Sequence, residues 1–132
     1  MSFFDSCSKK RLYAHEWIPS GTIQGVIFYV HGLHDHCARY DDFARHCNLH
    51  GFAVFALDHI GHGQSEGERG LWSDLSTVIV DQHSYVASVL GQYDSLPYFI
   101  VAKATGVIIA THVVDRIIVD NFSRNPAAFI GN

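Results

Sequence analysis

The chain lacks most of the features that mark secreted or membrane proteins. It contains only three cysteines, Cys7, Cys37 and Cys47, whose spacing fits neither disulfide pairs nor a metal motif, so we expect free thiols in a reducing compartment. No apolar run approaches the roughly 20 residues that cross a bilayer, and segment 1–17 is too polar for a signal peptide. We therefore expect a cytoplasmic protein that is not transmembrane.

Basic residues are also scarce. Nine Lys and Arg residues stand against 13 Asp and Glu, which gives a net charge of −4, and the basic residues are scattered along the chain. We therefore expect no nucleic-acid partner. With 132 residues, of which 48% are hydrophobic, the chain can bury one sizeable core, and it holds no internal repeat. Residues 1–132 are predicted to form one domain, or part of one.

Apolar patterning predicts alternating strands and helices. Short runs rich in β-branched and aromatic residues predict buried strands at 25–30, 52–57 and 98–101. Apolar residues at three- and four-residue steps predict helices over 39–50 and 74–92. Segment 105–119 is rich in Val and Ile, so propensity leaves helix and strand open, but its length after a strand favours a helix. The order predicts an α/β fold with a mostly parallel sheet flanked by helices.

Histidine and glycine gather in the two loops that follow the first two predicted strands. In parallel α/β sheets, functional groups collect where strands end. The first loop begins His31-Gly32-Leu33, and the second runs from Asp58 to Gly67. The candidate site residues in these loops are His31, Gly32, Asp58, His59, Gly61, His62, Gly63 and Ser65.

The loops resemble those of a known enzyme family. The chain reads His31-Gly-Leu-His-Asp-His36, then Arg39-Tyr40, then Asp58-His-Ile-Gly-His-Gly-Gln-Ser-Glu-Gly-Glu-Arg69. These segments are similar to the H-G-x-x-E-H, R-Y and D-H-x-G-H-G-x-S-E-G-x-R motifs of the monoacylglycerol lipase and serine aminopeptidase group of α/β-hydrolases. The resemblance implies an α/β-hydrolase fold and descent from enzymes that cleave carboxylic esters.

The nucleophile position departs from this family. Where the family has G-H-S-M-G-G, a sharp strand-to-helix turn that carries the serine, the chain reads Ala102-Lys-Ala-Thr-Gly-Val107. Ala104 has no oxygen to attack an ester carbonyl, so no acyl-enzyme can form there. Lys103 and Val107 replace the histidine and the last glycine of the motif, which can loosen the turn. The sequence therefore predicts a catalytically inactive homologue.

Other parts of the family's machinery are predicted to survive or to be missing. The resemblance assigns the oxyanion-hole amides to Leu33 and Thr105, and backbone groups survive side-chain substitution. It places the triad acid and histidine after later strands, so we expect a truncated α/β-hydrolase domain that ends before them. No cofactor or metal is expected, and an apolar or acyl ligand is the favoured partner. Strand 98–101 would be an apolar sheet edge, open to self-association.

Three alternatives stay open. Ser65 lies in Gly63-Gln-Ser-Glu-Gly67, which matches the G-x-S-x-G nucleophile motif, although the loop before it and the missing helix after it favour a structural role. A metal-dependent hydrolase would use a histidine cluster, but Leu33 interrupts its spacing. Its candidate ligands are His31, His34, Asp35, His36, His59 and His62. The chain could also be a non-functional gene fragment.

Overall fold

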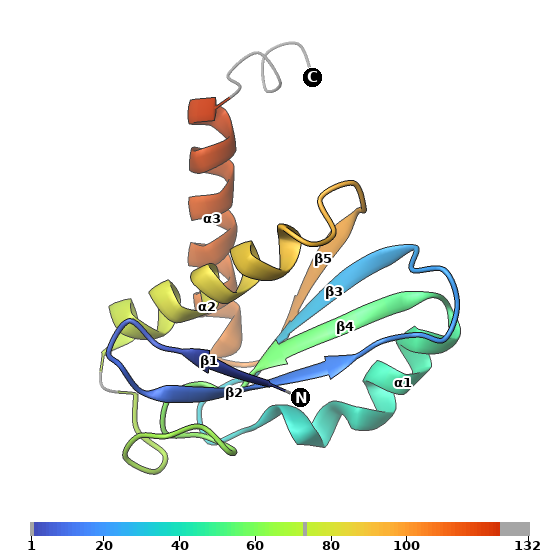
Figure 1. Ribbon diagram of the computed structural model, residues 1–132. Helices are drawn as coiled ribbons and strands as arrows, with labels where there is room; N and C mark the ends of the chain where they lie inside the picture. Colours follow the sequence, from blue (N-terminus) through green and yellow to red (C-terminus); the bar gives the residue numbers. More distant parts are fainter. Residues whose placement is uncertain (1, 73, 125–132) are drawn as a thin grey trace.

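A computed structural model describes residues 2–72 and 74–124, which form a five-stranded sheet with helices on both faces (Figure 1). The strands are β1 (Ser2–Asp5), β2 (Arg11–Trp17), β3 (Gly25–Val30), β4 (Phe52–Leu57) and β5 (Tyr98–Ala102). Their order across the sheet is β1-β2-β4-β3-β5. Strand β3 pairs in parallel with both β4 and β5, whereas β1 and β2 run antiparallel.

The predicted α/β class and the three predicted strands are confirmed, and two strands were missed. Strand β2 escapes a search for apolar runs because Arg11, His15 and Glu16 interrupt it. The only apolar stretch in β2 is 12–14, and the side chains of Leu12, Tyr13 and Ala14 are all buried. Strand β1 is short and mostly exposed, so its pairing with β2 depends on a tertiary contact that local sequence does not encode.

Helices cover the two faces of the sheet unequally. A 3₁₀ turn (Cys37–Tyr40) leads into α1 (Asp41–Leu49) on one face, and α2 (Leu75–Leu90) and α3 (Gly106–Arg124) lie on the other (Figure 1). Helix α2 begins where the sequence predicts, because the carboxylate of Asp74 accepts a hydrogen bond from the Thr77 amide. The segment left open by propensity is a helix, α3, and it extends beyond residue 119.

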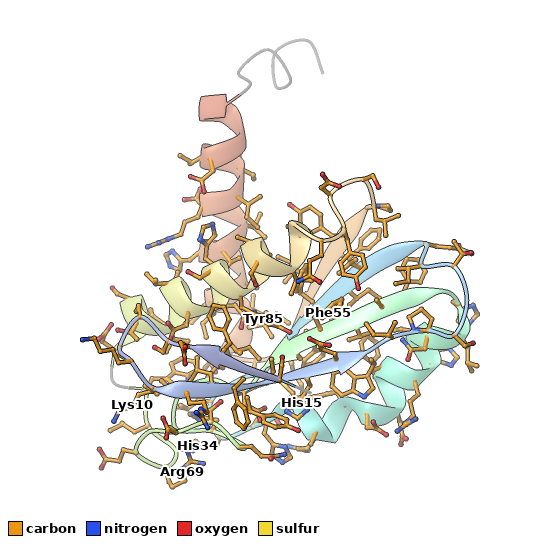
Figure 2. All side chains as sticks on the ribbon, in the orientation of Figure 1. Lys10, His15, His34, Phe55, Arg69 and Tyr85 are labelled. Atoms are coloured by element: carbon orange, nitrogen blue, oxygen red, sulfur yellow. The ribbon has the colours of Figure 1, made fainter. Side chains whose placement is uncertain are left out.

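The main core lies between the sheet and the helices α2 and α3. Phe55 on β4 and Tyr85 on α2 point into this layer (Figure 2). Other fully buried members come from β2, β3, α2 and α3: Leu12, Val26, Phe28, Val86 and Ile109. A smaller cluster around Tyr29, Cys37 and Ala56 fills the face under α1. Burial on both faces explains why β3 and β4 are continuous apolar runs.

Strand β5 forms one edge of the described sheet. Its side chains Tyr98, Phe99 and Val101 are exposed, Phe99 to 52%. This is the apolar edge predicted from the sequence, and self-association through it stays a prediction. Within residues 2–72 and 74–124, none of the helices combines the length and apolar character that a membrane span requires.

Candidate functional site

The chain turns sharply from β5 into α3 at residues 103–105 (Figure 1). Ala104 sits at this turn with a φ of +54°. A left-handed conformation is unfavourable for a residue with a Cβ, by about 1–2 kcal/mol relative to the right-handed one. The strained strand-to-helix turn that lifts a nucleophile above a sheet is therefore formed here, with a methyl group at its tip.

The loop after β3 packs directly against this turn. A Cβ added to Gly106 would lie 2.4 Å from the carbonyl oxygen of Val30 and 2.7 Å from that of His31. A Cβ added to Gly32 would lie 3.1 Å from the carbonyl oxygen of Lys103. Gly106 therefore requires glycine because two backbones approach closely, and a side chain at Gly32 would require the Lys103 carbonyl to shift by a few tenths of an ångström. Val107, which replaces the motif's last glycine, is half exposed and does not break the turn.

The two amides assigned to the oxyanion hole lie on either side of this contact. The Leu33 amide donates a hydrogen bond of 2.7 Å to the side-chain oxygen Oγ1 of Thr105. A donor that would face a substrate oxygen is thus already paired with a side chain of the protein. Thr105 supplies the second backbone amide of the predicted hole. Its hydroxyl oxygen also accepts the hydrogen bond of the first amide, that of Leu33.

Replacing Ala104 by glycine is expected to stabilise the fold by about 1 kcal/mol, because glycine adopts a positive φ without the Cβ clash. The melting temperature should rise by about 3–5 °C for a domain of this size. Thermal denaturation followed by circular dichroism measures this. As a control, Ala87→Gly in the last turn of α2 should destabilise by up to about 1 kcal/mol. A lower melting temperature for Ala104→Gly would contradict the strain argument.

The loop from Asp58 to Ser65 is largely buried rather than open to substrate. Asp58, His59, His62 and Ser65 are each at most 3% exposed. The hydroxyl of Ser65 donates to the carbonyl oxygen of Asp58 at 2.6 Å and accepts from the Tyr13 amide at 2.8 Å. Ser65 therefore ties the loop to β2 through both of its hydrogen-bonding functions, and among the described residues no imidazole hydrogen-bonds to its hydroxyl.

Asp58 is the centre of a buried polar network. Its Oδ1 accepts from the Cys37 amide at 2.8 Å, and its Oδ2 accepts from Nε2 of His15 at 3.0 Å and from the Gln64 amide at 3.1 Å. Burial alone would raise the pKa of this carboxyl group, but these three donors outweigh it and hold the pKa well below its usual range. Asp58 is therefore a structural anion that joins β2, β4 and the 3₁₀ turn.

Two hydrogen bonds between ring and backbone join His31 and His59. Nε2 of His31 accepts from the His59 amide at 2.9 Å, and Nε2 of His59 donates to the His31 carbonyl oxygen at 2.9 Å. Burial lowers the pKa of His31 to about 4, and that of His59 well below its usual value. Both rings are therefore neutral near pH 7, and their nitrogens are used for holding the backbone.

The histidine-rich loops bring together one group with metal-ligand geometry in the described chain. Ligand atoms of His31, Cys37 and Asp58 lie within 4.8 Å of one another. Each of the two ring nitrogens of His31 already has a hydrogen-bond partner, as does each oxygen of Asp58. Burial also raises the pKa of the Cys37 thiol well above its usual value, which disfavours the thiolate that metals bind. A metal would have to break this network.

The other candidate ligands of the predicted histidine cluster are not part of this group. The Asp35 carboxylate accepts from the Tyr40 hydroxyl and from the Arg39 guanidinium, so it braces the 3₁₀ turn. The rings of His31 and His62 lie 5.5 Å apart and those of His34 and His62 6.2 Å apart, as packed neighbours. Sequence reasoning missed the contact of His15 with Asp58, because it depends on β2, which was not predicted. It also missed the bond from the Cys37 amide to Asp58, which joins residues 21 positions apart.

An apolar hollow of about 410 Å³ lies beside the turn. It is bounded by β5 and the first half of α3, and its lining residues are Ile100, Ala102, Val107, Ala110, Thr111 and Val114. It lies on the flank of the turn that contains Thr105, at the outer side of β5.

Comparison with known proteins gives consistent matches. Residues 21–122 match the protein family described as serine aminopeptidase, S33. The monoglyceride lipase of Rattus norvegicus is 41% identical over 95 residues, which is 72% of this chain and 31% of the relative. The chain thus spans about a third of the length of this relative.

Solved structures show the same architecture. A lipase in its open form superposes with a TM-score of 0.73 at 32% identity, covering 82% of this chain and 37% of that one. A soluble variant of the monoglyceride lipase of Saccharomyces cerevisiae has a TM-score of 0.70 over 79% of this chain and 34% of that one. Its identity of 17% makes it a comparison of folds alone.

Proposed function

The chain belongs to the serine aminopeptidase S33 family of α/β-hydrolases, and we propose that it is a catalytically inactive member of that family. The observation that carries the proposal is Ala104 at the tip of the strand-to-helix turn, with a φ of +54°. Ester hydrolysis by a serine hydrolase begins when a side-chain oxygen at this tip attacks the ester carbonyl. A methyl group offers no lone pair, so the acyl-enzyme bond cannot form.

The Thr105 hydroxyl supports the same proposal independently. An oxyanion hole works when its donors wait unpaired for the charge that develops on the substrate oxygen. Here the Leu33 amide is engaged by Oγ1 of Thr105 at 2.7 Å. A substrate oxygen would first have to displace this hydroxyl. Restoring a serine at position 104 alone would therefore leave the hole half closed.

The geometry gives little support to the alternative of a hydrolase that uses Ser65 or a metal. The Ser65 hydroxyl is 2% exposed and is engaged by both Asp58 and Tyr13. The atoms of the His31, Cys37 and Asp58 group are held by hydrogen bonds within the fold. These residues serve as the internal scaffold of the two loops.

An apolar or acyl ligand is the binding function that fits an inactive member best. The matched relatives include monoglyceride lipases, whose name specifies an acyl substrate. The hollow beside the turn, at about 410 Å³, has the size of a small-molecule site and is lined mainly by Ile, Val and Ala side chains. Retention of the fold with loss of the nucleophile would convert an acyl-cleaving site into an acyl-binding one.

A hydrolysis assay tests the proposal. We expect no turnover of nitrophenyl butyrate or of a monoacylglycerol above the rate of buffer. Because the reason lies at residue 104, the same result is expected of any longer chain that carries this segment.

Two controls assign any turnover that is found. Activity lost in Ser65→Ala, in a variant shown to be folded, would establish the serine alternative. Activity lost to a chelator and recovered with zinc would establish the metal alternative. Either result would reject the proposed inactivity.

A further inference from the structure

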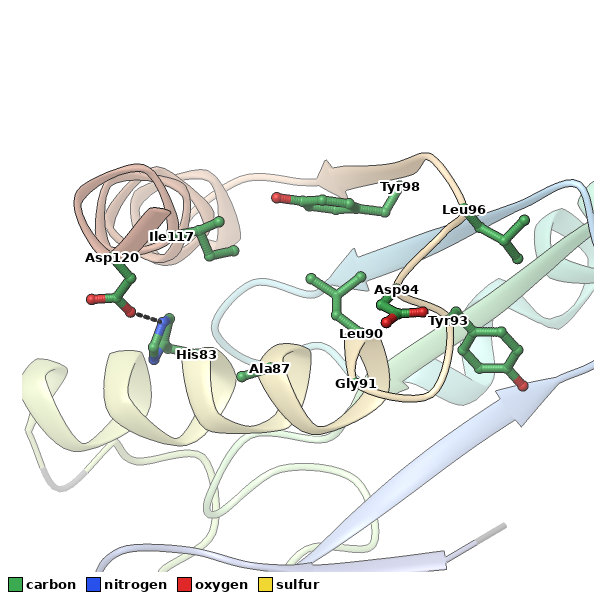
Figure 3. A pocket seen from close by; sticks show the side chains of 10 residues that line it. All are labelled: His83, Ala87, Leu90, Gly91, Tyr93, Asp94, Leu96, Tyr98, Ile117 and Asp120. Carbon is green, nitrogen blue, oxygen red and sulfur yellow. Dashed lines mark ion pairs between the residues drawn. The ribbon is translucent and has the colours of Figure 1, made fainter. Parts of the chain in front are cut away.

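A second hollow, of about 440 Å³, lies at the opposite end of β5 from Ala104. It opens between α2, α3 and the first residue of β5 (Figure 3). Its position separates it from the strand-to-helix turn, which follows the last residue of β5.

The middle of this hollow is apolar. Leu90 from α2 and Ile117 from α3 face each other across it, and the ring of Tyr98 covers them from β5 (Figure 3). The ring of Tyr98 also makes an edge-to-face contact with the ring of Phe28, with 6.4 Å between the ring centroids. Leu90 and Ile117 are half-buried, so a hydrocarbon group placed between them would remove further apolar surface from water.

The polar groups around this middle carry one sign of charge. Asp94 lies on the turn before β5, and Asp120 lies on α3 with its side chain 52% exposed. Nε2 of His83 stands 3.6 Å from the Asp120 carboxylate. Among the described residues, none that lines the hollow is Lys or Arg. A ligand entering it meets two acceptor carboxylates and the face of an aromatic ring, all of which favour a cation.

We propose that this hollow is a binding site for an organic ammonium ion, a ligand that joins one positive charge to a short hydrocarbon group. The ammonium group pairs with Asp94 or Asp120 at the rim, and the hydrocarbon lies between Leu90, Ile117 and Tyr98. An anionic ligand with the same hydrocarbon would meet like charge at both ends of the site. Charge therefore determines the selectivity, and the apolar walls provide the contact area.

Titration of the ¹⁵N-labelled protein with octyltrimethylammonium tests this, with octyl sulfate as the anion of matched chain length. We expect saturable amide shifts with the cation, centred on residues 83–98 and 117–120, and none there with the anion. Asp94→Asn and Asp120→Asn should each weaken binding by about two- to five-fold, as expected for exposed charge pairs. Asp115→Asn, an exposed α3 carboxylate outside the lining, should leave it unchanged.

A filling variant provides a second test. Ala87 is exposed and lines the hollow, so Ala87→Phe should remove binding while leaving the unfolding transition in place. If this variant does not fold, the doubly substituted Asp94→Asn, Asp120→Asn protein decides the question. The proposal is overturned if octyl sulfate binds equally well, if the shifts map to the hollow beside residues 100–114, or if the cation produces no saturable shift.

Discussion

Replacing Asp58 by alanine is expected to destabilise the fold by about 3–5 kcal/mol, the range seen when one partner is removed from a buried charged network. The change leaves three donors without their acceptor: Nε2 of His15 and the Cys37 amide, which are buried, and the Gln64 amide, which is partly buried. Each unpaired buried donor costs roughly 1–3 kcal/mol. Since small domains are stable by about 5–15 kcal/mol, this loss is a large part of the total free energy of unfolding. Urea denaturation measures the loss.

Glu68→Ala is the matched control for this substitution. Glu68 lies in the same glycine-rich segment but is exposed, so its loss should change stability by no more than about 0.5 kcal/mol. His15→Ala should fall between the two, because the Asp58 carboxylate keeps both amide donors. A cost below about 1 kcal/mol for Asp58→Ala would show that the network is dispensable.

Acid is expected to destabilise the protein between pH 6.5 and 4. Burial lowers the pKa of His31 from 6.5 to about 4 in the folded state. The unfolded chain therefore binds a proton near pH 6.5 that the folded chain does not bind until about pH 4. Stability is fully present above this window and falls as the pH drops through it, by about 3 kcal/mol for His31 alone. The lowered pKa of His59 acts in the same direction.

Chemical denaturation at a series of pH values checks this dependence. In His31→Gln, whose amide can accept from the His59 backbone and donate to the Gly32 carbonyl, the drop should shrink by about 3 kcal/mol. His50→Gln removes an exposed histidine and should leave the profile as it is. An unchanged free energy of unfolding from pH 7 to pH 4 would refute the role given to the buried histidines.

Local patterning predicted the strands that are uninterrupted apolar runs. Strands β3 and β4 are buried on both faces, and β5 keeps the same apolar pattern at an exposed sheet edge. Asp74 marks the start of α2 with a side-chain cap. Strand β2 was missed because its polar residue His15 is buried through pairing with Asp58, 43 positions away. Such pairs depend on the assembled sheet, so a local pattern does not reveal them.

The sequence indicates where the candidate site lies along the chain, but it does not indicate which of its residues contact one another. The motif in the sequence placed Ala104 at a strand-to-helix turn, and the positive φ of that residue is what such a turn requires. The hydrogen bond from the Leu33 amide to the Thr105 hydroxyl joins residues 72 positions apart, and it arises because two glycines let the loops touch. The family's motif has methionine at the position of Thr105, so the motif does not indicate that a hydroxyl there would accept a hydrogen bond from the Leu33 amide.

The proposed inactivity, which requires that no activated nucleophile is present at residue 104 or at any other described residue, is tested most directly by intact-protein mass spectrometry after incubation with a fluorophosphonate probe. A chain with only a methyl group at the tip of the turn should retain its unmodified mass, while an active serine hydrolase in the same tube is labelled. A stoichiometric phosphonyl adduct, located by peptide mapping to Ser65 or to any other side chain, would contradict it.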